Sequence, residues 1–192
     1  MRSALWMIGA LALAVVVVIG LVQAGVGGSP DPSDASDFNL EDARRKLAGA
    51  PAPLSGLHAQ ANQLLDGGLA AFDRRAEKLR GRPIVVNKWA SWCGPCQAEF
   101  SIFQAVGTAR GRQVGFLGLN TGHDGGARRF LDEHPLPFPT YIDRDAEIAR
   151  ALDVPTGFPM TVFIDRDGNR HVHTGAYKTR SDLNADIDRY SR

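Results

Sequence analysis

Short apolar runs that alternate with helical patterns most constrain the fold of this chain. The runs cover residues 84–89 (IVVNKW), 114–120 (VGFLGLN) and 160–165 (MTVFID). Helical patterns lie between and around them, at about 71–80, 97–109, 126–134, 146–152 and 179–190. Residues 166–169 (RDGN) are typical of a hairpin turn and lead into a further short strand at 170–174. The alternation predicts an α/β sheet that ends in an antiparallel hairpin.

The start of the chain is a candidate membrane segment. Residues 4–22 (ALWMIGALALAVVVVIGLV) are apolar apart from two glycines, and no charge occurs from Ser3 to Pro30. As a helix these 19 residues would span close to the roughly 30 Å of a bilayer core. Arg2 precedes the segment and acidic residues follow it, which places the N-terminus in the cytoplasm and the remainder outside. A cleaved signal peptide, with residues 22–24 (VQA) as its cleavage site, is the alternative, although such apolar cores usually run about 7–15 residues.

A linker and a short helical extension separate this segment from the main domain. Residues 25–37 are rich in Gly, Ser, Pro and Asp, as flexible linkers are. A helical pattern opens at Asn39, and residues 54–65 predict a second amphipathic stretch. We therefore divide the chain into an anchor or signal peptide (1–29), a linker with a helical extension (30–61) and a folded domain (62–192).

The charge balance argues against nucleic acid as a partner. The chain of 192 residues has a formal net charge of +1, and Arg2 is the only charged residue before Asp31. The part from Asp31 onward is therefore neutral and has no basic patch typical of nucleic-acid binding.

Both cysteines of the chain fall in one motif, Trp92-Cys93-Gly94-Pro95-Cys96. The motif follows the strand at 84–89 and opens a predicted helix. Free N–H groups and the helix dipole at that point favour a thiolate on Cys93 and lower its pKa below about 8.5. Cys96, one turn later, is close enough to attack a mixed disulfide. We expect Cys93 to be the nucleophile and Cys96 the resolving thiol.

Two structural roles for the cysteine pair are less well supported. A structural zinc site needs four ligands, usually from two such pairs or from added histidines, and this chain has one pair. A purely structural disulfide across so short a loop would constrain the unfolded chain little. Redox chemistry is the favoured interpretation, and no cofactor or metal is expected for it.

Residues 86–100 (VNKWASWCGPCQAEF) resemble the active-site strand and helix of thioredoxin-fold proteins, and more narrowly of the membrane-tethered TlpA/ResA-like thiol–disulfide oxidoreductases of bacterial envelopes. Residues 157–165 (GFPMTVFID) match a second motif of that family. The region between the motifs looks like the helix and strand that this family inserts. The resemblance covers about residues 62–192 and implies a thioredoxin fold with a helix–strand insertion before the strand that starts at a cis-proline.

The resemblance also implies supporting residues around the cysteines. Pro159 would be cis, face the cysteine motif and leave neighbouring backbone free to pair with an extended substrate. Trp92 would border the exposed sulfur, and Gly157 would line the substrate groove. Phe158 departs from the family, in which Val or Thr is common at that position, and we expect it to line the same groove and to narrow it or make it more apolar. Glu99 would be a partly buried acid that tunes a thiol pKa or moves a proton; a solvated helix carboxylate is the alternative.

Two residues of the strand at 84–89 depart from what the resemblance leads us to expect. Asn87 stands where cytoplasmic thioredoxins have a buried Asp, a role that Glu99 would take over. Lys88 interrupts the apolar run, and we expect its ammonium group to reach the surface.

The functional hypotheses follow from the motif and the resemblance. The first is a membrane-anchored extracytoplasmic enzyme that reduces cysteine pairs of envelope proteins, for example apocytochrome c, and is recharged by a membrane thiol-electron carrier. Gly94-Pro95 matches the reducing thioredoxins and favours this direction. An oxidase that forms disulfides in secreted proteins is the alternative. A copper-delivery module using the cysteines with His171 or His173 is the third, although hairpin surface histidines explain that pair more simply.

Overall fold

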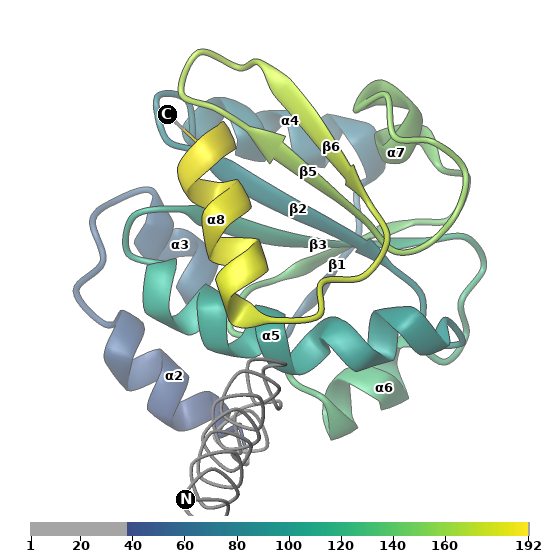
Figure 1. Cartoon of the computed structure of the whole chain (residues 1–192), viewed down its shortest axis with the longest axis horizontal. Coiled ribbons are helices and arrows are strands. Elements are labelled where there is room, and N and C mark those ends of the chain that lie inside the picture. The colour runs from purple at the N-terminus through teal and green to yellow at the C-terminus, as the bar shows by residue number, and fades with distance from the viewer. Residues whose placement is uncertain (1–37, 192) are drawn as a thin grey trace, which may run out of the picture. The chain divides into compact units, whose positions relative to one another are not determined.

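The computed structural model describes residues 38–191. Its helices and strands, in chain order, are α2 (Leu40–Leu47), α3 (Leu54–His58), β1 (Leu64–Leu65), α4 (Gly68–Lys78), β2 (Ile84–Trp89), α5 (Gly94–Arg110), β3 (Gly115–Thr121), α6 (Ala127–Glu133), β4 (Thr140–Asp143), α7 (Glu147–Ala151), β5 (Met160–Ile164), β6 (Arg170–Thr174) and α8 (Arg180–Tyr190) (Figure 1). The alternation of strands and helices predicted from the sequence is confirmed.

These strands form a single mixed sheet in the order β1-β4-β3-β2-β5-β6. β2, β3, β4 and β1 pair in parallel, whereas β5 is antiparallel to both β2 and β6. The parallel strands need helical crossovers, while β5 and β6 need only a tight turn at residues 166–169. The predicted hairpin therefore closes the sheet, and α6 and β4 form the helix–strand insertion between β3 and β5.

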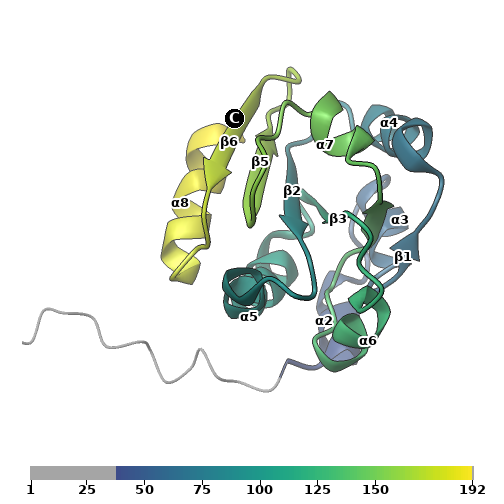
Figure 2. The ribbon, with the colours of Figure 1, turned by 90° about the vertical axis from the view of Figure 1, so that its right-hand side faces the viewer.

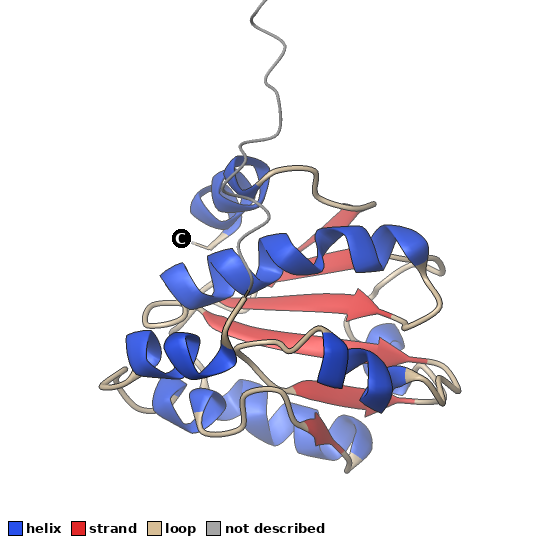
Figure 3. Cartoon of the chain, turned by 90° about the horizontal axis from the view of Figure 1, so that it is seen from below, coloured by secondary structure: helices blue, strands red, loops and turns tan. Residues whose placement is uncertain are grey.

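Helices cover both faces of the sheet (Figures 2 and 3). One hydrophobic cluster lies under α5, α6 and α8, and it includes Trp89, Phe103 and both cysteines. The other lies under α3, α4 and α7 and includes Leu57, Phe72 and Val86. Successive side chains of β2 point to opposite faces, so this strand contributes to both clusters and is buried along its whole length. The C-terminal end of β2 leads directly into the cysteine motif at the start of α5.

The helical extension packs onto the rest of the described chain. Asn39 caps α2 by accepting a hydrogen bond from the N–H of Asp42, and Ala43 and Leu47 are the buried residues of that helix. The expected amphipathic stretch at 54–65 is wrong in its second half. Leu64–Leu65 is a two-residue strand that pairs with β4, because an extended segment satisfies the open edge of β4.

The predicted membrane segment lies outside the described residues. Between residues 38 and 191, no helix is long and apolar enough to cross a membrane.

Candidate active site

The two cysteines form a disulfide at the N-terminus of α5. Cys93 is the N-cap residue, and its Sγ accepts a hydrogen bond from the backbone N–H of Cys96 at 3.2 Å. Pro95 lies in the first helical turn, where its missing N–H leaves no hydrogen bond unmade. Cys93 retains 6 % exposure, whereas Cys96 is fully buried. The less deeply buried cysteine is thus the one whose sulfur a helix N-terminus stabilises as a thiolate.

Aromatic side chains from two distant segments meet beside the disulfide. The Phe158–Pro159 peptide bond is cis, as the resemblance implied. Phe158 packs against the cluster that contains both cysteines, and its ring contacts Trp92 edge to face at 5.1 Å between centroids. Trp92 is 65 % exposed. Gly157 is also exposed and has a φ of +117°, which L side chains rarely adopt.

Glu99 is completely buried, so the solvated carboxylate considered as its alternative is excluded. Its Oε1 accepts a hydrogen bond from Nδ2 of Asn87 at 2.8 Å, and its Oε2 accepts one from the backbone N–H of Tyr177 at 3.0 Å. The carboxyl group therefore joins β2 to the loop before α8. Glu99 lies three residues after Cys96, so the two share one side of α5.

The pKa of Glu99 is raised to about 7. Burial is the main cause because it disfavours the carboxylate; the hydrogen bonds from Tyr177 and Asn87 oppose it only in part. A carboxyl group with a pKa near neutrality takes up and releases protons at physiological pH.

Lys88 does not reach the surface, and the sequence-based expectation is wrong. The residue is 4 % exposed, because the loop before β5 covers that face of β2. Its Nζ donates to the carbonyl oxygens of Pro155 and Gly157, each at 3.1 Å, and lies 4.6 Å from the centroid of the Phe158 ring. Burial lowers its pKa, and the nearby Asp143 carboxylate partly offsets that effect.

Asp124 is a supporting residue that the sequence did not reveal. Its carboxylate accepts hydrogen bonds from both the N–H and the hydroxyl of Ser91, from the Asn120 amide and from the Gly126 N–H. Burial by itself raises its pKa, but these hydrogen bonds outweigh it and the pKa is lowered. The carboxylate thus fixes the residues that immediately precede Trp92 and Cys93. A lone Asp in a Gly-rich loop gives no sequence signal for such a role.

His171 and His173 lie on the side of β6 where α8 packs, and both are half-buried rather than surface side chains. The His171 ring stacks on Tyr190, and the His173 ring stacks on Tyr177 with its Nδ1 3.2 Å from Asp186. Throughout residues 38–191, no three His, Cys, Asp or Glu side chains form a group suited to a metal ion.

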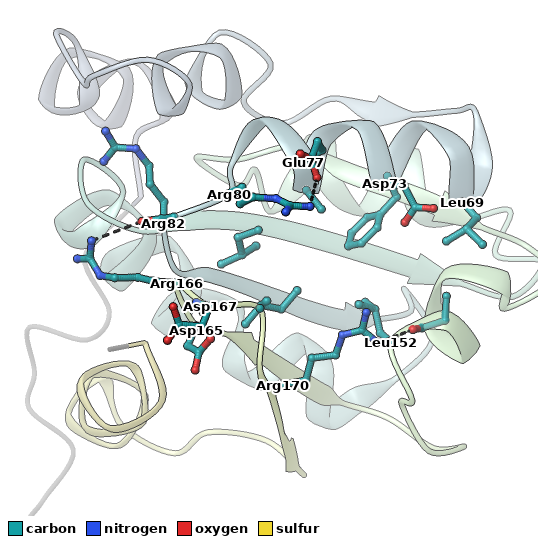
Figure 4. Close-up of a pocket in the computed structure, with 17 residues that line it drawn as sticks. Leu69, Asp73, Glu77, Arg80, Arg82, Leu152, Asp165, Arg166, Asp167 and Arg170 are labelled. Atoms are coloured by element: carbon teal, nitrogen blue, oxygen red, sulfur yellow. Dashed lines mark hydrogen bonds and ion pairs between the residues drawn. The ribbon is translucent and has the colours of Figure 1, made fainter.

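A pocket of about 510 Å³ lies at the other end of the sheet (Figure 4). It is lined where β2 begins and β5 ends, for example by Ile84 and Ile164, which pair with each other. Three of its four arginines are engaged: Arg80 pairs with Glu77, and Arg166 and Arg170 each donate to a backbone carbonyl oxygen. The cysteines, Glu99 and Pro159 are not among its lining residues.

A thioredoxin-like α/β fold with a cysteine pair at a helix N-terminus defines a class, the thiol–disulfide oxidoreductases. Comparison with known proteins agrees: residues 48–187 match the model of the Redoxin family, to which the chain belongs. The chain is accordingly an enzyme of the thiol–disulfide oxidoreductase class, as the sequence predicted.

Individual relatives support the narrower resemblance. The chain is 28 % identical over 123 residues to the thiol–disulfide oxidoreductase ResA of Geobacillus kaustophilus. The aligned segment covers 62 % of this chain and 70 % of that protein. It is 35 % identical over 92 residues to the thiol:disulfide interchange protein DsbE of Pseudomonas fluorescens, covering 47 % and 49 % of the two chains. A solved structure of a secreted Mycobacterium tuberculosis disulfide oxidoreductase, homologous to E. coli DsbE, has 29 % identity and a TM-score of 0.52 over 59 % of this chain and 85 % of that one. The resemblance to ResA-like oxidoreductases is confirmed.

Proposed function

We propose that this enzyme acts outside the cytoplasm, tethered by its N-terminal segment, and reduces cysteine pairs of envelope proteins, for example during cytochrome c maturation. The observation that carries the proposal is the asymmetry of the disulfide: Cys93 caps α5 and retains some exposure, whereas Cys96 is buried behind it. The apolar segment at 4–22 and the acidic residues after it support the location.

In the proposed reaction the reduced enzyme donates two electrons. The Cys93 thiolate attacks one sulfur of a substrate disulfide, which forms a mixed disulfide and releases the first substrate thiolate. The Cys96 thiolate then attacks Sγ of Cys93, which releases the second substrate thiolate and leaves the Cys93–Cys96 disulfide. A membrane thiol-electron carrier returns the enzyme to the dithiol form by the same exchange in reverse.

Glu99 is proposed to serve the second step. The Cys96 thiol is buried and must lose its proton before it attacks, and water reaches it poorly. A carboxylate one helical turn away, with a pKa of about 7, accepts that proton near neutral pH. The hydrogen bonds from Asn87 and Tyr177 hold it in place.

Pro159, Phe158 and Gly157 are proposed to form one wall of the substrate groove, with Trp92 and the Gly94-Pro95 turn as the other. The contact between the rings of Phe158 and Trp92 supports this assignment. An extended substrate segment would pair with backbone groups next to Pro159.

The reduction potential of the Cys93–Cys96 couple, measured against glutathione, tests the direction. A value near −270 mV, as in thioredoxin, is expected for a reductase. A value near −120 mV would instead make the protein an oxidant for secreted proteins and refute the proposed direction.

Trapping tests the order of the cysteines. Cys96→Ser is expected to accumulate mixed disulfides with envelope proteins, because the resolving thiol is missing, whereas Cys93→Ser is expected to form none. Adducts on Cys93→Ser alone would reverse the assignment.

Protease treatment of intact cells that express the full chain tests the proposed location. In a cell with one membrane, a domain that is degraded only after the membrane is permeabilised would contradict a location outside the cytoplasm.

A further inference from the structure

Lys88 is a charged residue in an otherwise apolar stretch of the central strand. The neighbours that share its face of β2, Ile84 and Val86, are buried in the hydrophobic cluster under α3, α4 and α7. An ammonium group is costly to bury unless its charge and its N–H groups find partners. The contacts of Lys88 therefore indicate what the residue holds.

The hydrogen bonds and the ring contact of the Lys88 ammonium group all lead to the segment that precedes the cis-proline, while the Asp143 carboxylate on β4 acts on it through its charge. Two of its three N–H groups go to the carbonyl oxygens of Pro155 and Gly157, and the nitrogen lies 4.6 Å from the centroid of the Phe158 ring. The two carbonyls lie two residues apart, so the ammonium group ties down the loop on both sides of Thr156. The cation–π contact with the ammonium group favours this position of the Phe158 ring.

Phe158 links the Lys88 ammonium group to the residue that precedes the disulfide. Its ring contacts Trp92, the residue immediately before Cys93, edge to face at 5.1 Å. The exposed residues of the cysteine motif, Trp92, Gly94 and Pro95, carry no charge, and neither does the exposed Gly157 beside Phe158. Because Lys88 is buried, its charge supports this surface without being presented to a bound substrate.

We propose that Lys88 is a positioning residue for substrate binding, and that the Phe158–Trp92 pair it holds selects cysteines flanked by an aromatic or large aliphatic residue. The inference rests on the proposed function and specifies its substrate class. An uncharged aromatic surface beside the reactive sulfur gains free energy by burying an apolar neighbour of the substrate cysteine and gains nothing from a small polar one.

The test compares three thiols as reductants of the oxidised full-length protein. Two are short peptides with one cysteine that differ only in the next residue, phenylalanine or serine; the third is dithiothreitol, which reports the chemistry of the disulfide without a peptide. A peptide thiolate attacks Sγ of Cys93, forms a mixed disulfide and releases the Cys96 thiolate. Quenching and thiol labelling give each rate.

The rate ratio of the phenylalanine peptide to the serine peptide is the readout. We expect a ratio of about ten for the wild type, since burial of an aromatic side chain contributes that much easily. Lys88→Met keeps the length of the side chain but removes its charge and donors, and is expected to bring the ratio close to one. Lys78→Met, at an exposed lysine of α4, is the matched control and keeps the wild-type ratio.

Two results would overturn the inference. One is a ratio near one in the wild-type protein, and the other is a folded Lys88→Met variant whose ratio is the same as that of the wild type. If Lys88→Met does not fold, Phe158→Leu decides: loss of the ring must lower the ratio, and an unchanged ratio refutes the proposal. A wild-type protein that dithiothreitol reduces normally but that shows no peptide preference contradicts this inference alone. A disulfide that none of the three thiols reduces contradicts the proposed function itself.

Discussion

Replacing Glu99 by Gln should change how stability depends on pH. The carboxyl group has a pKa of about 7 in the folded protein, against an ordinary value of 4.5 in the unfolded chain. The folded state therefore keeps the proton longer, so this group favours folding at low pH and loses that effect as the pH rises through the folded-state pKa. The two pKa values differ by an amount that corresponds to about 3 kcal/mol.

Glutamine preserves the hydrogen bonds while removing the titration. Its amide oxygen accepts from the Tyr177 N–H, and its amide nitrogen donates to Asn87 once the Asn87 side chain turns over to present its oxygen. Between pH 5 and pH 8 the free energy of unfolding should therefore fall by about 2–3 kcal/mol more in the wild type than in Glu99→Gln.

Urea denaturation of the oxidised proteins at several pH values measures this difference. Glu133→Gln, at an exposed carboxylate of α6, is the control and should follow the wild type. Parallel curves for the wild type and Glu99→Gln would refute the reasoning, because they would mean that Glu99 ionises in the folded protein as it does in the unfolded chain.

Three further predictions concern the surroundings of the site. Asp124→Asn should lower the free energy of unfolding by about 1–2 kcal/mol at pH 7, because the hydrogen bonds from Ser91 become weaker. This loss of stability should shrink as the pH falls through the lowered pKa of the wild-type carboxylate, and thermal unfolding across about pH 2–7 checks it. Gly118→Ala should destabilise by about 3 kcal/mol in urea, because a Cβ there would lie 2.2 Å from Oγ1 of Thr140 on the paired strand. Alkylation of reduced Cys93 by iodoacetamide should have its midpoint below pH 8.5, and a midpoint at or above about that value would contradict the helix-terminus argument.

Local patterns in the sequence were sufficient for much of the fold and for the reactive pair. β2 was placed with its observed bounds because its six residues are apolar enough to mark a buried strand, and the cysteine motif marked the start of the next helix. β1 was missed because two residues carry no periodicity, and this strand exists only through its pairing with β4.

Supporting contacts were harder to predict because they join residues far apart in the chain. Lys88 was expected at the surface since nothing near it in sequence shows that a loop 67 residues later covers it. Ser91 and Asp124, 33 residues apart, meet only when α5 and β3 bring their flanking loops together. The proposed role of Glu99 came from a resemblance, and its hydrogen bond from the Tyr177 N–H joins residues 78 positions apart.

The hydrogen bond between Glu99 and Tyr177 spans 78 residues and has a consequence for biosynthesis. A chain is made from its N-terminus, so the cysteine pair leaves the ribosome long before the residue that completes the surroundings of the acid. Until the loop before α8 has been added and has folded back, the Glu99 carboxyl group lacks the hydrogen bond from the Tyr177 N–H. A nascent or truncated chain that ends before this loop thus contains both cysteines and Glu99, but the carboxyl group lacks one of the two hydrogen bonds that hold it in the complete chain.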